Sequence, residues 1–335
     1  MAAKLSDVAT LAGVSIKTVS NVIHDYPHIR PETKQRVLDA ITQLNYRPNL
    51  NARNLRSGRT GVIGLVVPTL RNPYFSELAE AVIDAADRNG VSVLIEQSRN
   101  TQRATKAQLV DGVLFSVLGP GQEDTGLFAQ ITSSPTEDSD ETTPVDHVTM
   151  RNTEAIQAAT DHLLALGRTR IAAIGARPDE DAGTASLRLL GYQHALSGGG
   201  LVLDQALVRR ADNWTRFDGA AATQSLIDEG VEFDGIVCFN DSLALGAIRA
   251  LAQNDIRVPQ DVSVIGFDDL DESRYSVPAL TTISPGREQI AALAVDMLME
   301  RISARDDVIA AREITVPFTL VERESTAPVE IRPAL

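Results

Sequence analysis

The 335-residue chain is poor in cysteine and aromatic residues, and it has no long apolar segment. Its single cysteine, Cys238, has no partner for an intramolecular disulfide, so we expect a buried structural thiol. No apolar stretch approaches the roughly 20 residues that a membrane-spanning helix needs. The first residues also lack the apolar core of a secretion signal. These absences lead us to expect a cytoplasmic protein with no membrane partner.

The sequence also lacks the motifs of phosphate, dinucleotide and metal chemistry. It contains no GxGxxG after a strand, no GxxxxGK[ST] and no histidine or cysteine cluster with the spacing of a metal site. No nucleophile, base and orienting group occur in a recognisable catalytic arrangement. We therefore expect no catalytic residues, no cofactor and no metal, and we expect that the protein is not an enzyme.

Basic residues are scarce beyond residue 60, so the charge of the chain is divided. Residues 1–60 carry nine lysines and arginines against four acidic residues, whereas the remaining 275 residues carry 22 against 41. A small basic segment joined to a large acidic body is typical of a nucleic-acid-binding protein with a second, separate domain. The chain is also too long for one core, which predicts a small head and one or two lobes.

The basic segment has the pattern of three short helices. A helix expected over 6–12 should end at Gly13, because glycine accepts the left-handed backbone of a helix stop. Ser15 should cap a second helix over 16–24, and a third is expected over 31–44. Two short helices joined by a tight turn and braced by a third form a helix-turn-helix unit.

Several motifs of this segment resemble the head of the lactose-repressor (LacI/GalR) family. They are Leu5-Ser6-Asp7-Val8-Ala9, Gly13-Val14-Ser15, Thr18-Val19-Ser20 and Leu44-Asn45-Tyr46-Arg47-Pro48-Asn49, and the likeness continues from Ala52 to Thr60. The resemblance extends over nearly the whole chain. It implies a helix-turn-helix DNA-binding head over 1–48, a hinge helix and linker over 49–60, and a two-lobed body like that of periplasmic binding proteins.

The resemblance implies that Ile16, Lys17 and Asn21 face base edges in the major groove. Their chemistry fits, since lysine can donate to guanine, asparagine can pair with adenine, and isoleucine can contact a thymine methyl. Thr18 and Ser20 would bind phosphates, which positions the helix without reading sequence. The alternative for Lys17 and Asn21 is a solvated helix face.

The hinge carries a second set of expected DNA contacts. In the family this segment folds on the operator, and a leucine from each subunit enters the minor groove. Leu55 stands at that position, with Ala52 one turn before it, and apolar wedging is a known way to kink DNA. Arg53 and Arg56 add charge that attracts phosphates. The alternative for the leucine is a linker residue that packs on the next domain.

Beyond Gly61, continuous apolar stretches alternate with segments of helix length. The stretches cover 62–67, 91–95, 112–117, 145–148, 170–174, 235–239, 262–267 and 314–321. This alternation predicts α/β lobes with doubly wound parallel sheets. From the family we expect an N-terminal lobe of 61–150 plus 284–313 and a C-terminal lobe of 151–283 plus 314–335.

The family binds a small effector between its lobes, where strands of open parallel sheets end. Trp214 lies in a polar turn and could stack on a sugar ring, with a core position as the alternative. Arg188, expected to open a helix, offers a donor fork for paired hydroxyls. We expect structural roles for Asp241, as a helix cap, and for Asp269, in a turn. The positions that match the family's effector contacts are Tyr74, Phe75, Arg188, Trp214, Asn240 and Asp268.

One segment departs from the family pattern. Residues 130–143 contain a single apolar side chain, and residues 119–144 carry six acidic residues and no basic one. Such a composition is typical of a loop or a disordered segment. We therefore expect the first lobe to lack a strand of its sheet.

Together these features predict a homodimeric, sequence-specific transcriptional regulator, most simply a repressor. It would bind a pseudo-palindromic operator in double-stranded DNA and respond to a small sugar effector. Three alternatives are a solute-binding protein for sugar uptake, a cytoplasmic sugar enzyme, and a regulator whose effector response is lost through the abnormal 119–144 segment. The first would have no use for residues 1–60, and the second lacks a catalytic constellation.

Overall fold

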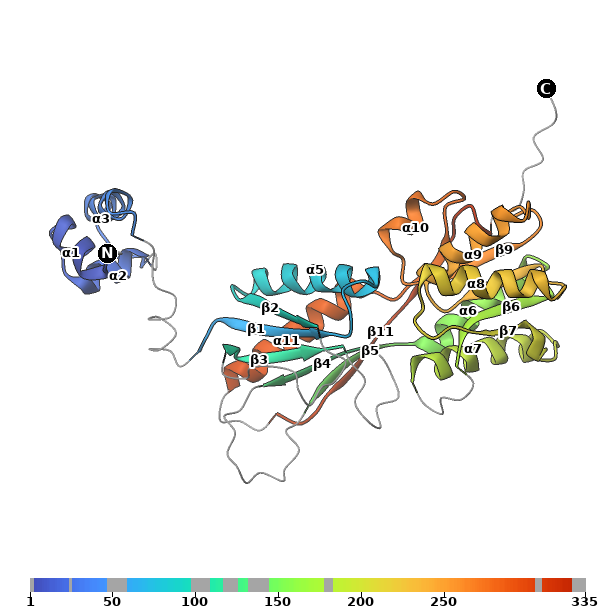
Figure 1. Cartoon of the computed structure of the whole chain (residues 1–335). Helices are drawn as coiled ribbons and strands as arrows, with labels where there is room; N and C mark the ends of the chain where they lie inside the picture. The colour runs from blue at the N-terminus through green and yellow to red at the C-terminus, as the bar shows by residue number, and fades with distance from the viewer. Residues whose placement is uncertain are drawn as a thin grey trace. The chain divides into compact units, whose positions relative to one another are not determined.

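The protein was analysed as a computed structural model. It describes residues 3–23, 26–46, 59–97, 109–116, 126–131, 145–177, 183–304 and 309–326. The chain divides into two compact units, residues 1–60 and 61–335 (Figure 1). None of the helices in the described ranges is long and apolar enough to cross a membrane.

The first unit is a three-helix bundle. Its helices are α1 (Leu5–Ala12), α2 (Ile16–Ile23) and α3 (Pro31–Gln43). Val8, Val19 and Val37 are fully buried, one from each helix, and form the centre of its core. As predicted, α1 ends at Gly13, whose φ of 64° is the left-handed value that glycine adopts without strain. Ser15 accepts the backbone N–H of Thr18 (3.1 Å), the expected cap of α2.

The first lobe of the second unit is a six-stranded sheet in the order β11-β5-β4-β3-β1-β2. The strands are β1 (Val62–Val67), β2 (Ser92–Gln97), β3 (Gly112–Phe115), β4 (Gly126–Ile131), β5 (Asp146–Met150) and β11 (Glu313–Val316). Helices α5 (Pro73–Arg88) and α11 (Arg287–Ala304) pack on each other and share a core with Ile63, Leu65 and Val67 of β1.

Strand β4 corrects the expectation that this lobe lacks a strand. It inserts between β3 and β5 and is antiparallel to both. Leu127 and Ala129 point into the core, while Phe128 stacks on Phe115 (5.3 Å) and His147 (4.1 Å). Only ten residues separate β3 from β4, fewer than the dozen or so that a parallel crossover needs, so the chain returns antiparallel.

The second lobe is another six-stranded sheet, in the order β12-β10-β9-β8-β6-β7. Its strands are β6 (Ile171–Ala176), β7 (Val208–Arg210), β8 (Gly235–Cys238), β9 (Ser263–Phe267), β10 (Thr281–Ser284) and β12 (Thr319–Val321). Its helices are α6 (Asn152–Ala165), α7 (Thr184–Gly198), α8 (Arg216–Asp228), α9 (Asp241–Gln253) and the short α10 (Asp271–Tyr275), with a 3-10 turn at Gln205–Leu207. All pairings are parallel except that of β12 with β10.

The chain passes between the two sheets after β5, after β10 and after β11. The third passage lies beyond the predicted boundary at residue 313, because β11 pairs with β5 along its whole length. The apolar stretch 314–321, expected as one strand, is therefore divided between the two sheets.

Asp146 on β5 anchors this passage. It is fully buried, and it accepts hydrogen bonds from Arg301 (2.6 and 2.5 Å) and from the Arg312 guanidinium (2.9 Å). Arg301 lies on α11, and Arg312 directly precedes β11. One carboxylate thus joins β5 to two segments that lie 155 and 166 positions further along the chain.

Candidate functional site

Helix α2 presents the predicted base-reading residues on its surface. Val19 and Val22 are buried in the bundle and fix the orientation of the helix. Ile16 is 52% exposed, Lys17 is also exposed, and Asn21 follows one turn later on the same side as the lysine. An apolar side chain, a cation and an amide, from Ile16, Lys17 and Asn21, therefore lie together on the part of α2 that could contact a DNA groove.

The other predicted DNA contacts are placed only in part. The Thr18 hydroxyl lies 2.9 Å from that of Ser15, so it belongs to the cap at the start of α2, and Ser20 is half-buried. The hinge residues lie outside the described residues. They are Ala52, Arg53, Leu55 and Arg56.

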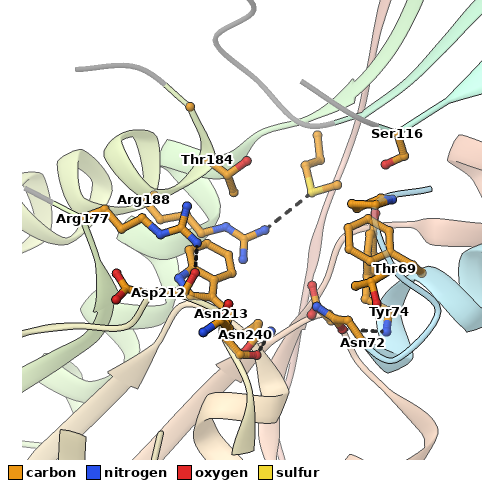
Figure 2. Close-up of a pocket in the computed structure, with 17 residues that line it drawn as sticks. Thr69, Asn72, Tyr74, Ser116, Arg177, Thr184, Arg188, Asp212, Asn213 and Asn240 are labelled. Carbon is orange, nitrogen blue, oxygen red and sulfur yellow. Dashed lines mark hydrogen bonds between the residues drawn. The ribbon is translucent and has the colours of Figure 1, made fainter. Parts of the chain in front are cut away.

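A cavity of about 460 Å³ lies between the two lobes of the second unit. All six side chains predicted to contact an effector line it, namely Tyr74, Phe75, Arg188, Trp214, Asn240 and Asp268. Figure 2 shows Thr69, Tyr74 and Ser116 of the first lobe across the cavity from Arg188 and Asn240 of the second.

The indole of Trp214 is held in place by its neighbours. Its backbone has a φ of 52°, and its Nε1–H donates to the carbonyl of Gly175 (2.9 Å). Phe239 meets the ring edge-to-face at 6.1 Å. The guanidinium carbons of Arg177 and Arg188 lie 5.7 and 5.3 Å from the ring centroid, within cation–π range.

Arg188 is an unusually buried cation, with only 3% of its surface exposed. Its Nε donates to Asn152 Oδ1 (2.8 Å), and its Nη1 donates to the carbonyl of Phe239. The guanidinium also lies 3.6 Å from the centroid of the Phe267 ring. Helix α7 begins at Thr184, so this arginine lies on the second turn and does not open the helix as expected.

Asn240 lines the cavity as predicted and also takes the capping role that was expected of Asp241. Asn240 is the cap of α9, accepting the N–H of Leu243 (2.8 Å), and its Nδ2 donates to the carbonyl of Trp214 (3.1 Å). It therefore ties the tryptophan turn to the helix.

Asp241 is the first helical residue and is fully buried. It accepts from the hydroxyls of Thr282 (2.6 Å) and Ser273 (2.7 Å) and from the N–H of Leu270 (2.9 Å). Burial raises its pKa to about 7, although these hydrogen bonds oppose the rise. This carboxyl group therefore holds residues 268–273, which connect β9 to α10 and begin with the cavity-lining Asp268.

Asp268 begins that loop in a strained backbone conformation. Its φ is 121°, and that of Asp269 is 50°, values that side chains other than glycine rarely adopt. Its side chain is 5% exposed, and burial raises its pKa well above the ordinary value, against the attraction of Arg188 and Arg287. Asp269 instead forms an ion pair with Arg323 (2.5 Å).

Tyr74 and Phe75 enter the cavity from the first turn of α5. Asn72 caps this helix by accepting the N–H of Tyr74 (3.1 Å). The two rings meet edge-to-face at 5.3 Å. The cavity thus combines aromatic surface from both lobes with amide, carboxyl and guanidinium groups, a composition suited to binding a small polar ring.

Sequence reasoning missed other residues that line the cavity. They are Pro68, Thr69, Ser116, Met150, Arg177, Gly183, Thr184, Ala185, Asp212 and Asn213. Thr69, Ser116 and Arg177 follow β1, β3 and β6 within two residues. Their position just after the carboxyl end of a parallel strand is a signal that could have identified them.

Comparison with known families agrees with both units. Residues 4–49 match the family described as bacterial regulatory proteins, lacI family, and residues 160–326 match the periplasmic binding protein-like domain. The HTH-type transcriptional regulator RegA of Clostridium saccharobutylicum is 32% identical over 337 aligned positions, covering 97% of this chain and all of that protein.

Three solved structures are similar over most of the chain. A putative LacI-family regulator from Sanguibacter keddieii is 40% identical, with a TM-score of 0.71 over 81% of this chain and all of its own. The lac repressor dimer bound to operator and the anti-inducer ONPF has 26% identity and a TM-score of 0.76 over 98% and 100%. The regulator CelR in complex with cellobiose has 28% identity and a TM-score of 0.66 over 96% and 99%. The predicted fold class, a helix-turn-helix head on a two-lobed α/β body, is confirmed, although both sheets contain an antiparallel strand.

Proposed function

Because the chain belongs to the LacI family of DNA-binding transcriptional regulators, we propose that it is a homodimeric repressor whose affinity for a pseudo-palindromic operator is controlled by a small sugar. It acts in the cytoplasm, where its DNA target lies, and without catalysis. The observation that carries the sugar response is the interlobe cavity, around which all six predicted effector residues meet.

The DNA-binding half of the proposal is supported by α2. Its exposed Ile16 and Lys17 flank a buried stripe that anchors the helix, and the similar lac repressor is a dimer on its operator. An uptake protein is disfavoured, because a LacI-type head at residues 4–49 would have no role in solute capture.

The test of DNA binding uses duplexes selected from a randomised palindromic library, with affinity measured by fluorescence anisotropy. Lys17→Ala is expected to lose about 1–3 kcal/mol of discrimination at one base pair. Lys34→Ala, on α3, is the matched control and should leave base preference unchanged. If the wild-type protein at low salt binds selected and scrambled duplexes equally, the regulator proposal fails.

The sugar half is supported by the aromatic and polar lining of the cavity, and by the cellobiose complex of the similar CelR. Strand β4 completes the sheet of the first lobe and argues against a lost effector response. A sugar C–H face on the Trp214 indole, with hydroxyls on Arg188 and Asp268, would satisfy the groups that line the site.

The sugar is sought by thermal shift with cellobiose and a panel of other mono- and disaccharides. A ligand should raise the melting temperature of the wild type and of Phe217→Ala, whose ring is exposed on α8 outside the cavity. It should not stabilise Trp214→Ala to the same extent. Equal stabilisation of the Trp214 variant would exclude the stacking role, and a panel without any shift would exclude the sugar proposal.

A further inference from the structure

Two charged side chains of the first lobe meet at its boundary with the second lobe. Glu77 lies on α5, and Arg287 is the first residue of α11. They form an ion pair of 2.8 Å, with the arginine 13% and the glutamate 21% exposed. Burial raises the pKa of Glu77, while the neighbouring Arg287 opposes the rise.

Both side chains also reach the second lobe. Glu77 Oε1 accepts the backbone N–H of Asp271 (3.2 Å), at the start of α10. Arg287 Nη1 donates to the carbonyl of Asp268 (3.3 Å), whose side chain lines the cavity. Figure 1 shows α10 near the end of α5 that faces the second lobe. The pair therefore binds residues 268–271 from the first lobe, and Asp241 binds the same segment from within the second lobe.

The stability of the first lobe alone does not explain this ion pair, because placing it here costs desolvation energy. Arg287 Nε is buried and has no hydrogen-bond partner among the described residues. Desolvating two charged groups offsets much of their attraction, so a half-buried pair such as this contributes little to stability but can fix one geometry.

We propose that Glu77 and Arg287 form an interlobe latch that sets the separation of the lobes and transmits the state of the cavity, through the Asp268 loop, to the first lobe. The link to operator binding rests on the proposed function. The hold on the lobes does not, because it is made entirely by contacts within residues 61–335.

The latch is tested on the full chain by double electron–electron resonance, which measures the distance between two spin labels. Spin labels are attached to Asp84→Cys on α5 and Asp228→Cys at the end of α8, both exposed positions, while the native Cys238 is fully buried. Glu77→Ala and Arg287→Ala are expected to move the label–label distances to a second, separated population, favoured roughly tenfold or more over its share in the wild type.

Two further variants separate positioning from folding. Glu77→Gln keeps an acceptor for the Asp271 N–H but breaks the ion pair, so it should give an intermediate distribution even if the alanine variants fold poorly. Glu300→Gln breaks the Glu300–Arg312 pair (2.5 Å), which also involves α11 but joins two residues of the first lobe. It should match the wild type.

The distances are measured without sugar or DNA, so the outcomes are distinguishable. If the Glu77 and Arg287 variants give the same distances as Glu300→Gln, the latch is wrong. If the wild-type protein binds no selected operator, the proposed function is wrong and the latch stands. With operator DNA, both latch variants should change affinity several-fold; an altered separation with unchanged affinity would overturn the regulatory part.

Discussion

The two lobes each contain a fully buried carboxylate, and the two are held in opposite ways. In the first lobe, burial would raise the pKa of Asp146, but hydrogen bonds from Arg301 and Arg312 outweigh burial and lower it to about 2. In the second lobe, Asp241 has the Thr282 hydroxyl and other uncharged donors, and burial raises its pKa to about 7. Charge joins distant segments in one lobe, and uncharged hydrogen bonds orient a cavity loop in the other.

The cavity walls differ in the same sense. In the second lobe Trp214 donates to a backbone carbonyl, Arg188 does likewise, and Asn240 ties the tryptophan turn to α9. In the first lobe Tyr74 and Phe75 lie on one helical turn capped by a single asparagine. The cavity side chains of the second lobe are thus held by several hydrogen bonds before any ligand binds, whereas the aromatic rings of the first lobe depend on the position of one helix end.

The largest expected effect is the loss of the charged anchor. Asp146→Asn should lower the free energy of unfolding by about 3–5 kcal/mol, because the buried Arg301 loses its anionic partner and Arg312 keeps only the exposed Glu300. Urea unfolding at pH 7 measures it, with Glu300→Gln as the control. A loss no larger than that of the control would mean that packing alone holds β11 in place.

The two carboxylates should also give pH dependences of opposite sign. The native pKa of Asp146 is below its unfolded value, so its contribution is present above about pH 4 and is lost as the pH falls towards 2. The native pKa of Asp241 is raised, so its contribution is present below about pH 4 and is lost as the pH rises to about 7, by at most about 1.4 kcal/mol per pH unit.

Urea midpoints of wild type, Asp146→Asn and Asp241→Asn from pH 2 to 8 separate the two effects. Asp241→Asn should reduce the decline between pH 4 and 7, to which Asp268 and Glu77 also contribute because burial raises their pKa values, and Asp146→Asn should reduce the decline between pH 4 and 2. If the wild-type slope between pH 4 and 7 is undiminished in Asp241→Asn, the whole decline belongs to other groups.

Helix packing in the second lobe gives the next effect. A methyl group on Gly219 of α8 would collide with the backbone of Leu243 on α9. Gly219→Ala should therefore cost about 1–3 kcal/mol through overpacking. Gly198→Ala, at the open end of α7 where a methyl group meets nothing, should be neutral or stabilising by up to about 1 kcal/mol. Thermal unfolding measures both, and equal effects would contradict the close approach.

The smallest effect concerns the rigid wall of the cavity. Asn240→Ala removes the cap of α9 and the hydrogen bond to the Trp214 carbonyl, at a cost of about 1 kcal/mol. Because Trp214 is the only tryptophan, its fluorescence reports the change directly. Acrylamide quenching should increase in both Asn240→Ala and Asn240→Asp, because neither side chain can donate to the Trp214 carbonyl, although aspartate retains the cap. Unchanged quenching in both variants would mean that the tryptophan turn is fixed without Asn240.

The sequence predicted the elements that are apolar along their whole length. Strands β1, β6 and β9 are buried throughout or nearly so, and their continuous apolar stretches are visible in the chain. Strand β10 was missed because Thr281 and Thr282 are polar, and their burial depends on hydrogen bonds to Ser325 and Asp241, which lie far away in the sequence. Strand β4 was missed because its short apolar stretch, Leu127 to Ala129, lies within an acidic segment.

The site shows the same division. The resemblance to a known family identified Trp214, Arg188 and Asp268 at the cavity, because their motifs are local. Asn240 lines the cavity as predicted, but the cap of α9 was assigned to Asp241, since either side chain can cap a helix and only tertiary neighbours decide between them. The Glu77–Arg287 pair joins segments 210 positions apart and has no signature in the sequence.

The position of β11 has a consequence for the order in which the protein is made. The first lobe begins with β1 at residue 62, but its sheet is completed only by β11, which ends at residue 316, and α11 packs on that sheet. On a ribosome, the N-terminal lobe must therefore wait for almost the whole chain to emerge before it can close its core, whereas the strands β6 to β9 are already available. The lobe that is synthesised first is completed late.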